Sequence, residues 1–146
     1  MLALSLEQQA EIRAHGERDY PHECCGLLLG QFNANGLKSV AEIYPISNAR
    51  EEAAKRNRFL IRPEELIKGE QYAARKNLEV IGFYHSHPDH PAVPSAYDLE
   101  HAWPTYSYIV VAVAAGQARD LRSWEMRVDR SQFDEEEIEQ QSLKGS

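Results

Sequence analysis

Residues 84–98 read YHSHPDHPAVPSAYD and follow directly on the apolar run VIGF, residues 80–83. Such a run predicts a strand, and alternate side chains of a strand share a face. We therefore expect His85 and His87 to point the same way at the end of this strand, with Ser86 turned away from them. Three prolines then exclude a helix or a central strand and predict a loop; they occupy positions 88, 91 and 94.

A helix is predicted to begin after this loop. Ser95 is a favourable N-cap residue, and Asp98, three positions later, falls in the first turn. Two imidazoles and one carboxylate are a ligand set of catalytic zinc, which keeps a fourth position for water. The spacing therefore predicts a zinc site at His85, His87 and Asp98. The Ser-x-x-Asp pattern alone more often caps a helix, and here the capping and ligand interpretations are compatible.

Several residues near this pattern have two interpretations. His90 could reach a substrate, although a solvated loop histidine is the more common case. His101, one turn after Asp98, could support the site or pack against its neighbours. Trp103 could line a groove or pack beside the helix. Four basic residues between positions 50 and 58 could meet an acidic partner, but a solvated loop is the favoured account.

Composition limits the class of protein. The chain has 146 residues, of which 42% are hydrophobic and 27% charged, as expected for one globular domain. A net charge of −7 argues against a nucleic-acid partner, and no apolar run approaches the length of a membrane span. The first residues lack the features of a signal peptide, and adjacent Cys24 and Cys25 make no disulfide framework. We therefore expect a cytoplasmic protein without a membrane or nucleic-acid partner.

The rest of the chain alternates between helix and strand patterns. Helices are predicted over residues 5–19, capped by Ser5 with Gln8, and over residues 63–76, begun by Pro63. Residues 48–58 are a loop or a short surface helix. The predicted strands cover residues 24–29, 38–46, 59–61, 78–84, 107–114 and 118–128, the last two forming an antiparallel pair.

These patterns predict an α/β protein, in which a single-domain mixed β-sheet is flanked by helices. We expect the domain to cover residues 1–130. Residues 131–146 form an acidic C-terminal tail, either a frayed strand or a disordered end.

Glu23 stands directly before the buried strand at 24–29. A carboxylate in this place is either a surface residue at a strand end, the more common case, or a general base held near the metal. The order His22-Glu23 is not part of an H-E-x-x-H zinc motif, because the position of the second histidine is occupied by Gly26.

Together these positions resemble a known family. Glu23, His85-x-His87, seven residues, Ser95, two residues and Asp98 are similar to the complete JAMM motif of the MPN-domain metalloproteases. The flanking segments ECCGLLLG (23–30) and GFYHSHP (82–88) also match, and the resemblance covers roughly residues 5–128. It implies the JAMM/MPN fold, which is cytidine-deaminase-like.

The resemblance also implies a role for each matched residue. His85, His87 and Asp98 would hold one zinc ion per chain. Glu23 would take a proton from the zinc-bound water and pass it to the leaving amine, which is general acid–base catalysis. Ser95 would help to hold that water or stabilise the oxyanion.

The compact chain is most similar to the small stand-alone prokaryotic members of the family. The resemblance then implies a ubiquitin-like sulfur-carrier protein as substrate, cleaved after its C-terminal Gly-Gly. The alternative is a non-catalytic MPN-type scaffold or a module that only binds ubiquitin-like proteins. A zinc deaminase would need a Cys-x-x-Cys ligand pair, which this sequence lacks.

Overall fold

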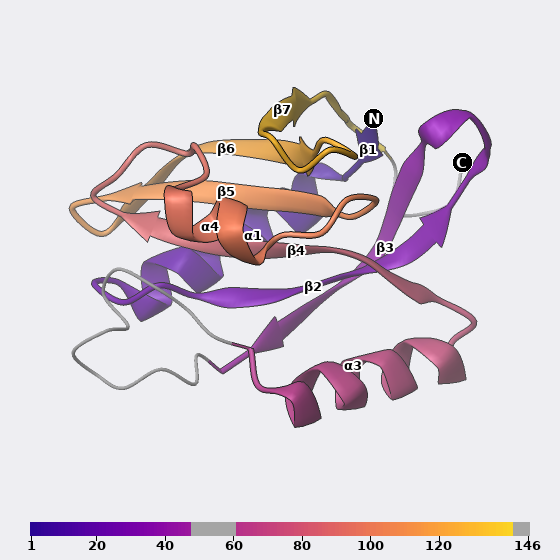
Figure 1. Ribbon diagram of the computed structural model, residues 1–146. Helices are drawn as coiled ribbons and strands as arrows, with labels where there is room; N and C mark the ends of the chain where they lie inside the picture. Colours follow the sequence, from indigo (N-terminus) through magenta and orange to yellow (C-terminus); the bar gives the residue numbers. More distant parts are fainter. Residues whose placement is uncertain (48–60, 142–146) are drawn as a thin grey trace.

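A computed structural model describes residues 1–47 and 61–141 of the chain. Figure 1 shows a single sheet with helices on both of its faces. In chain order the elements are β1 (Leu2–Ala3), α1 (Leu6–Asp19), β2 (Cys25–Phe32), the 3-10 turn η1 (Ala34–Gly36), β3 (Lys38–Ile46), α3 (Pro63–Arg75), β4 (Glu79–Pro88), α4 (Ala96–His101), β5 (Ser107–Ala114), β6 (Gln117–Met126), β7 (Phe133–Glu136) and β8 (Ile138–Glu139).

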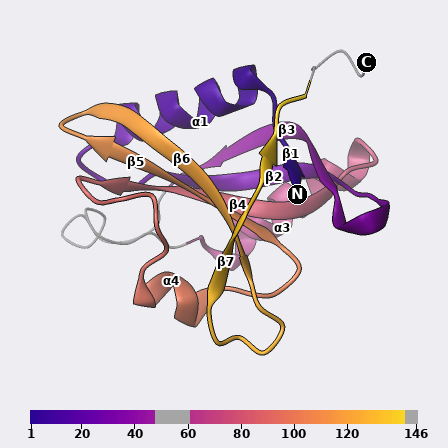
Figure 2. The ribbon, with the colours of Figure 1, turned by 90° about the horizontal axis from the view of Figure 1, so that it is seen from above.

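The sheet is mixed, as the sequence predicted. Its strand order is β7-β6-β5-β4-β2-β3-β1-β8. Strand β4 lies in the interior, antiparallel to β2 and parallel to β5, and β5 pairs antiparallel with β6. Helix α1 covers one face, and α3 and α4 lie on the other, as Figure 2 shows from above. No helix among the described residues has the length and apolar character needed to cross a bilayer.

Local sequence signals account for most of these elements. Ser5 caps α1 in a full capping box with Gln8, as predicted, and α3 begins at Pro63. Strands β3 and β5 match the predicted ranges 38–46 and 107–114. The predicted loop or helix at 48–58 and residues 59–60 of a predicted strand lie outside the described residues.

Strand β4 extends further than its apolar run. It was predicted to end near Tyr84, but it continues to Pro88 because residues 85–88 pair in register with β5 residues 110–113. Proline has no N–H to donate to the ladder, and Pro88 is the residue at which β4 ends. Both histidines therefore lie within a paired strand, where the sheet fixes their backbone.

The two faces of β4 belong to different cores. Tyr84 packs with Ile12 of α1 in one cluster of buried side chains. Phe83 packs with Leu66 and Ala73 of α3 in another cluster, on the opposite face. His85 and His87 share the face of Phe83, because they lie two and four residues further along the strand.

The acidic segment after residue 130 carries strands β7 and β8 at the two ends of the strand order. Only Glu137 separates them in the chain, so the sheet curls until its two edges meet there (Figure 2). Of the two interpretations left open for this segment, strand formation is the one observed at residues 133–136 and 138–139, and residues 142–146 lie outside the described residues. The boundary at residue 130 stays a prediction, although both strands beyond it belong to the same sheet.

A buried carboxylate lies where these edges meet. Glu136 is only 5% exposed and accepts hydrogen bonds from the hydroxyls of Ser107 (2.7 Å) and Ser123 (2.9 Å). The ammonium of Lys38, itself buried, lies 3.3 Å from its other oxygen. These contacts join strands β3, β5, β6 and β7 through one side chain.

We predict that Glu136→Ala lowers the free energy of unfolding by about 3 kcal/mol, because two buried hydroxyls lose their acceptor and a buried ammonium loses a partner. The adjacent, exposed Glu137 offers a matched control, and Glu137→Ala should change that free energy by less than about 0.5 kcal/mol. Urea unfolding followed by circular dichroism measures both. Equal losses in the two variants would contradict a stabilising role for the Glu136 contacts.

Candidate metal centre

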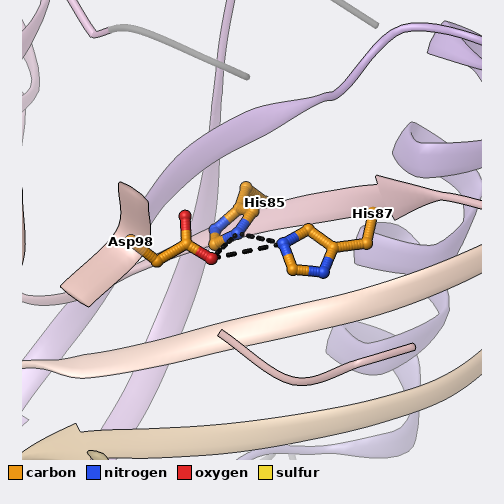
Figure 3. Close-up of side chains that lie close together, drawn as sticks. All are labelled: His85, His87 and Asp98. Carbon is orange, nitrogen blue, oxygen red and sulfur yellow. Dashed lines mark hydrogen bonds and ion pairs between the residues drawn. The ribbon is translucent and has the colours of Figure 1, made fainter. Parts of the chain in front are cut away.

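Three of the predicted site residues converge on one point (Figure 3). The Nε2 atoms of His85 and His87 lie 3.0 Å apart, and each is 3.2 Å from Oδ2 of Asp98. Within the described part of the chain, these residues are the cluster of histidine, cysteine and acidic side chains that could hold a metal ion. The structure thus brings together the three ligands that the spacing predicted.

Two secondary-structure elements position this cluster. His85 and His87 alternate with Ser86 along β4, and Ser86 is fully buried on the other face, as predicted. Asp98 lies in the first turn of α4, where Ser95 caps the helix: the Asp98 N–H donates to Ser95 Oγ (3.1 Å) and the Ser95 N–H to Asp98 Oδ2 (2.8 Å). The same carboxylate oxygen completes the cap and faces both imidazoles, so the two interpretations of Ser-x-x-Asp hold together.

The loop after β4 orients the ring of His87. Its Nδ1 lies 2.9 Å from the carbonyl oxygen of Pro91, which can only accept a hydrogen bond. The proton therefore sits on Nδ1, and Nε2 presents its lone pair to His85 and Asp98. A ring oriented in this way through its other nitrogen is typical of histidine ligands to metals.

Burial and charge set the protonation states of the cluster. Burial lowers the pKa of His85, more than the nearby Asp98 carboxylate raises it, so the imidazole is neutral near pH 7. Burial alone would raise the pKa of Asp98. Hydrogen bonds from the imidazole of His85 and from the Ser95 backbone N–H outweigh burial and lower that pKa well below its usual range. Neutral imidazoles and an ionised carboxylate are the forms that bind metal.

The spacing of the donor atoms fits zinc. Nitrogen and oxygen ligands lie about 2.0–2.1 Å from zinc, so two corners of the tetrahedron around it are about 3.3 Å apart. The three separations here are 3.0, 3.2 and 3.2 Å. The donor set is therefore already close to the arrangement that a three-ligand zinc site requires.

The remaining predicted residues, Glu23 and Ser95, face a cavity beside this cluster. Its volume is about 520 Å³, and His87 also lines it. Glu23 is only 4% exposed, so it is not the ordinary surface residue at a strand end. The neighbouring backbone holds it there, because the Cys24 N–H donates to the buried Ser86 hydroxyl (2.8 Å).

The other residues near the motif are placed differently. His90 is exposed and lines the same cavity as Glu23. His101 stacks on Tyr97, with ring centroids 4.1 Å apart, and its Nδ1 donates to the Tyr97 carbonyl. Trp103 is 64% exposed and, with Phe83, lines a separate groove. The basic residues at 50–58 lie outside the described residues.

The contacts that hold the loop could not be predicted from the sequence. Besides the Pro91 carbonyl, the indole N–H of Trp124 donates to the carbonyl of Ala92 (3.1 Å). Trp124 lies on β6, 32 residues away in sequence. Neither contact has a local signal, because backbone carbonyls are present at every position.

Comparison with known proteins supports this description. The family model for prokaryotic homologs of the JAB domain, Prok-JAB, matches residues 5–127. A protein of Haloferax volcanii named desampylase is 34% identical over 114 residues, which cover 75% of this chain and 78% of that protein. A Thermus thermophilus protein named probable TtuB-protein conjugate cleaving protease is 31% identical over 100 residues, covering 68% of this chain and 62% of that protein.

Solved structures share the fold. A protein of Desulfitobacterium hafniense superposes with a TM-score of 0.83 at 29% identity, covering 97% of this chain and 93% of the other. A JAB1/MPN domain protein of Archaeoglobus fulgidus superposes with a TM-score of 0.57 at 18% identity, covering 97% and 98%, and shows the fold alone. Because the family model spans most of the chain, the resemblance inferred from the motif is confirmed: this protein belongs to the prokaryotic homologs of the JAB domain.

Proposed function

We propose that this protein is a zinc-dependent peptidase or isopeptidase that hydrolyses the bond after the C-terminal Gly-Gly of a ubiquitin-like sulfur-carrier protein. The observation that carries the proposal is the convergence of His85, His87 and Asp98 beside a cavity lined by Glu23. The names of the relatives, desampylase and TtuB-protein conjugate cleaving protease, support a hydrolase of the JAMM type that acts on protein conjugates. The free, buried Cys24 and Cys25 are in keeping with the cytoplasm as its compartment.

In this proposal His85, His87 and Asp98 hold one zinc ion. Zinc supplies a Lewis acid that polarises the scissile carbonyl and lowers the pKa of water towards neutrality. Glu23 takes the proton of the attacking water and later gives it to the leaving amine. Glu23 is buried and lines the same cavity as His87, so its carboxylate is held on the side of the predicted ligands.

Ser95 combines two tasks in this scheme. Its Oγ accepts the Asp98 N–H in the helix cap, which fixes the hydroxyl at the wall of the cavity. Because the oxygen acts there as an acceptor, the hydroxyl hydrogen can still be donated into the cavity. We infer that it donates to the oxyanion that develops on the scissile carbonyl.

Zinc content tests the proposed ligand set. The purified protein should contain about one zinc per chain, measured by elemental analysis, as one three-ligand site requires. His87→Ala and Asp98→Ala should each lose most of it, because two protein ligands bind zinc much less tightly. His90→Ala is the matched control in the same loop and should retain zinc. Full retention in both His87→Ala and Asp98→Ala would rule out this ligand set.

Substitution of Glu23 separates metal binding from proton transfer. Glu23→Gln should retain zinc and the fold but lose turnover by about two to four orders of magnitude, the usual contribution of a general acid–base residue. Cleavage of a carrier conjugate, followed by mass spectrometry, measures the loss. Glu100→Gln, an exposed glutamate on α4, is the control. Normal turnover in Glu23→Gln would contradict the mechanism, and loss of zinc would make Glu23 a ligand.

Substitutions in the carrier's C-terminal tail test the proposed substrate. The cavity is lined by Pro91, Val93 and Pro94. A tail of two glycines carries no side chains that could obstruct an extended backbone in it. Replacing the carrier's last glycine with a large residue should reduce cleavage far more than a substitution on the carrier's distant surface. Initial rates of cleavage, measured for the two carrier variants at equal concentration, test this expectation. Equal rates, or efficient hydrolysis of unrelated unfolded peptides, would exclude selection of a Gly-Gly tail. Bound zinc without any cleavage would favour a non-catalytic binding module.

A further inference from the structure

The segment that carries Glu23 is hydrogen-bonded to the end of β4 on both sides of that residue. On the C-terminal side, the Cys24 N–H donates to Ser86 Oγ (2.8 Å), and the Ser86 N–H donates to the Cys24 carbonyl (3.2 Å). On the N-terminal side, the hydroxyl of Tyr20 donates to Oδ2 of Asp89 (2.7 Å). Ser86 and Asp89 flank His87 in the sequence, so both contacts connect Glu23 to the backbone of a predicted ligand.

Asp89 is fixed by the turn between β5 and β6. Its N–H donates to the Val113 carbonyl (2.8 Å), and its Oδ1 accepts the Ala115 N–H (2.9 Å). Its φ of 58° lies in the left-handed region, which aspartate tolerates better than most residues. One carboxylate oxygen of Asp89 therefore accepts a hydrogen bond from the turn, and the other accepts one from the Tyr20 hydroxyl.

Tyr20 connects this carboxylate to the segment that bears Glu23. It ends α1, with its N–H donating to the Gly16 carbonyl (3.1 Å), and its side chain packs against the core cluster of Ile12 and Tyr84. Only two residues separate Tyr20 from Glu23, and the first of them is Pro21, which restricts the backbone further. This short, restricted segment therefore transmits a shift of Tyr20 towards Glu23, whose other neighbour, Cys24, is held to β4.

We propose that Tyr20 and Asp89 are positioning residues, whose hydrogen bond sets the distance between the Glu23 carboxylate and the site at His87. The inference rests on the proposed function, in which Glu23 transfers protons. A general base must lie within hydrogen-bond reach of the proton that it takes. Displacement by about 1 Å can cost about a hundredfold in rate, so a single hydroxyl remote from the reacting atoms controls turnover.

Tyr20→Phe tests this proposal, because it removes the hydroxyl and leaves the packed ring. The matched control is Tyr72→Phe on α3, where the lost hydroxyl also donates to a carboxylate, Glu42 Oε1 at 2.6 Å, but has no connection to Glu23. We expect Tyr20→Phe to lower kcat about 10- to 100-fold. KM for the conjugate and zinc content should change less than about twofold, because the ligands and the rest of the site are intact. Tyr72→Phe should match the wild type in all three measurements.

Two further variants distinguish positioning from loss of fold stability. Asparagine tolerates positive φ as aspartate does, so Asp89→Asn keeps the backbone conformation. Its side chain has one acceptor oxygen for two donors, the Tyr20 hydroxyl and the Ala115 N–H, so the variant should reproduce part of the kcat loss. In a Glu23→Gln background, Tyr20→Phe should add almost no further loss, because the group that it positions is already inactive. A full additional loss in that background would overturn the proposal, as would a Tyr20→Phe enzyme with the wild-type kcat.

A readout without turnover keeps this inference separate from the proposed function. In metal-free protein labelled with ¹³C-glutamate, the carboxyl carbon signal of Glu23, assigned with Glu23→Gln, should shift or broaden in Tyr20→Phe and stay unchanged in Tyr72→Phe. If the wild type cleaves no carrier conjugate, the proposed function fails, and this signal still decides whether Tyr20 positions Glu23. An unchanged Glu23 signal in Tyr20→Phe would overturn the positioning role.

Discussion

The site depends on the register of β4, because the register decides on which face of the sheet His85 and His87 lie. The contacts of Tyr84 fix this register. Tyr84 pairs directly with Gly26 of β2, and a Cβ on Gly26 would lie 2.2 Å from its ring. Its hydroxyl lies 2.7 Å from Nδ1 of the buried His15 on α1. A slip of one residue would exchange the two faces and move His85 and His87 to the helix α1 side. The glycine and the tyrosine thus keep both imidazoles on the face of α4.

The parts of the molecule that depend on residues close together in the chain could be predicted from the sequence. Strands 38–46 and 107–114 follow from short-range periodicity, and the three predicted ligands lie within 14 residues of one another. Contacts between distant segments carried no such signal. The environment of Glu23 depends on Ser86, 63 residues later in the chain, and that of Glu136 depends on two serines in other strands. Two-residue strands such as β1 were missed because they form only by pairing with neighbours that are already in place.

The functional face is built from groups that are costly to bury. Glu23, His85 and His87 are each less than a tenth exposed, and Asp98 shares one oxygen between a helix cap and two imidazoles. The two Nε2 atoms lie only 3.0 Å apart, a separation that requires a proton or a cation to be shared among the three side chains. The surrounding sheet holds them together, because β4 is paired on both sides through Pro88 on β5 and through His85 on β2. Costly buried polar groups are thus concentrated at one point of the fold, and the rest of the sheet holds them in place.

The curled sheet also constrains the order in which the chain can complete its fold during synthesis. Strand β1 is made first, yet one of its two neighbours, β8, consists of residues 138 and 139. A ribosome adds about 5–20 residues per second, so β1 has one open edge for several seconds while the rest of the chain is translated. Only two residues of β1 are paired on each side, which keeps that open edge too short to recruit another chain. The brevity of the terminal strands, which hid them in the sequence, thus leaves little open edge at β1 for another chain to pair with while the protein is being made.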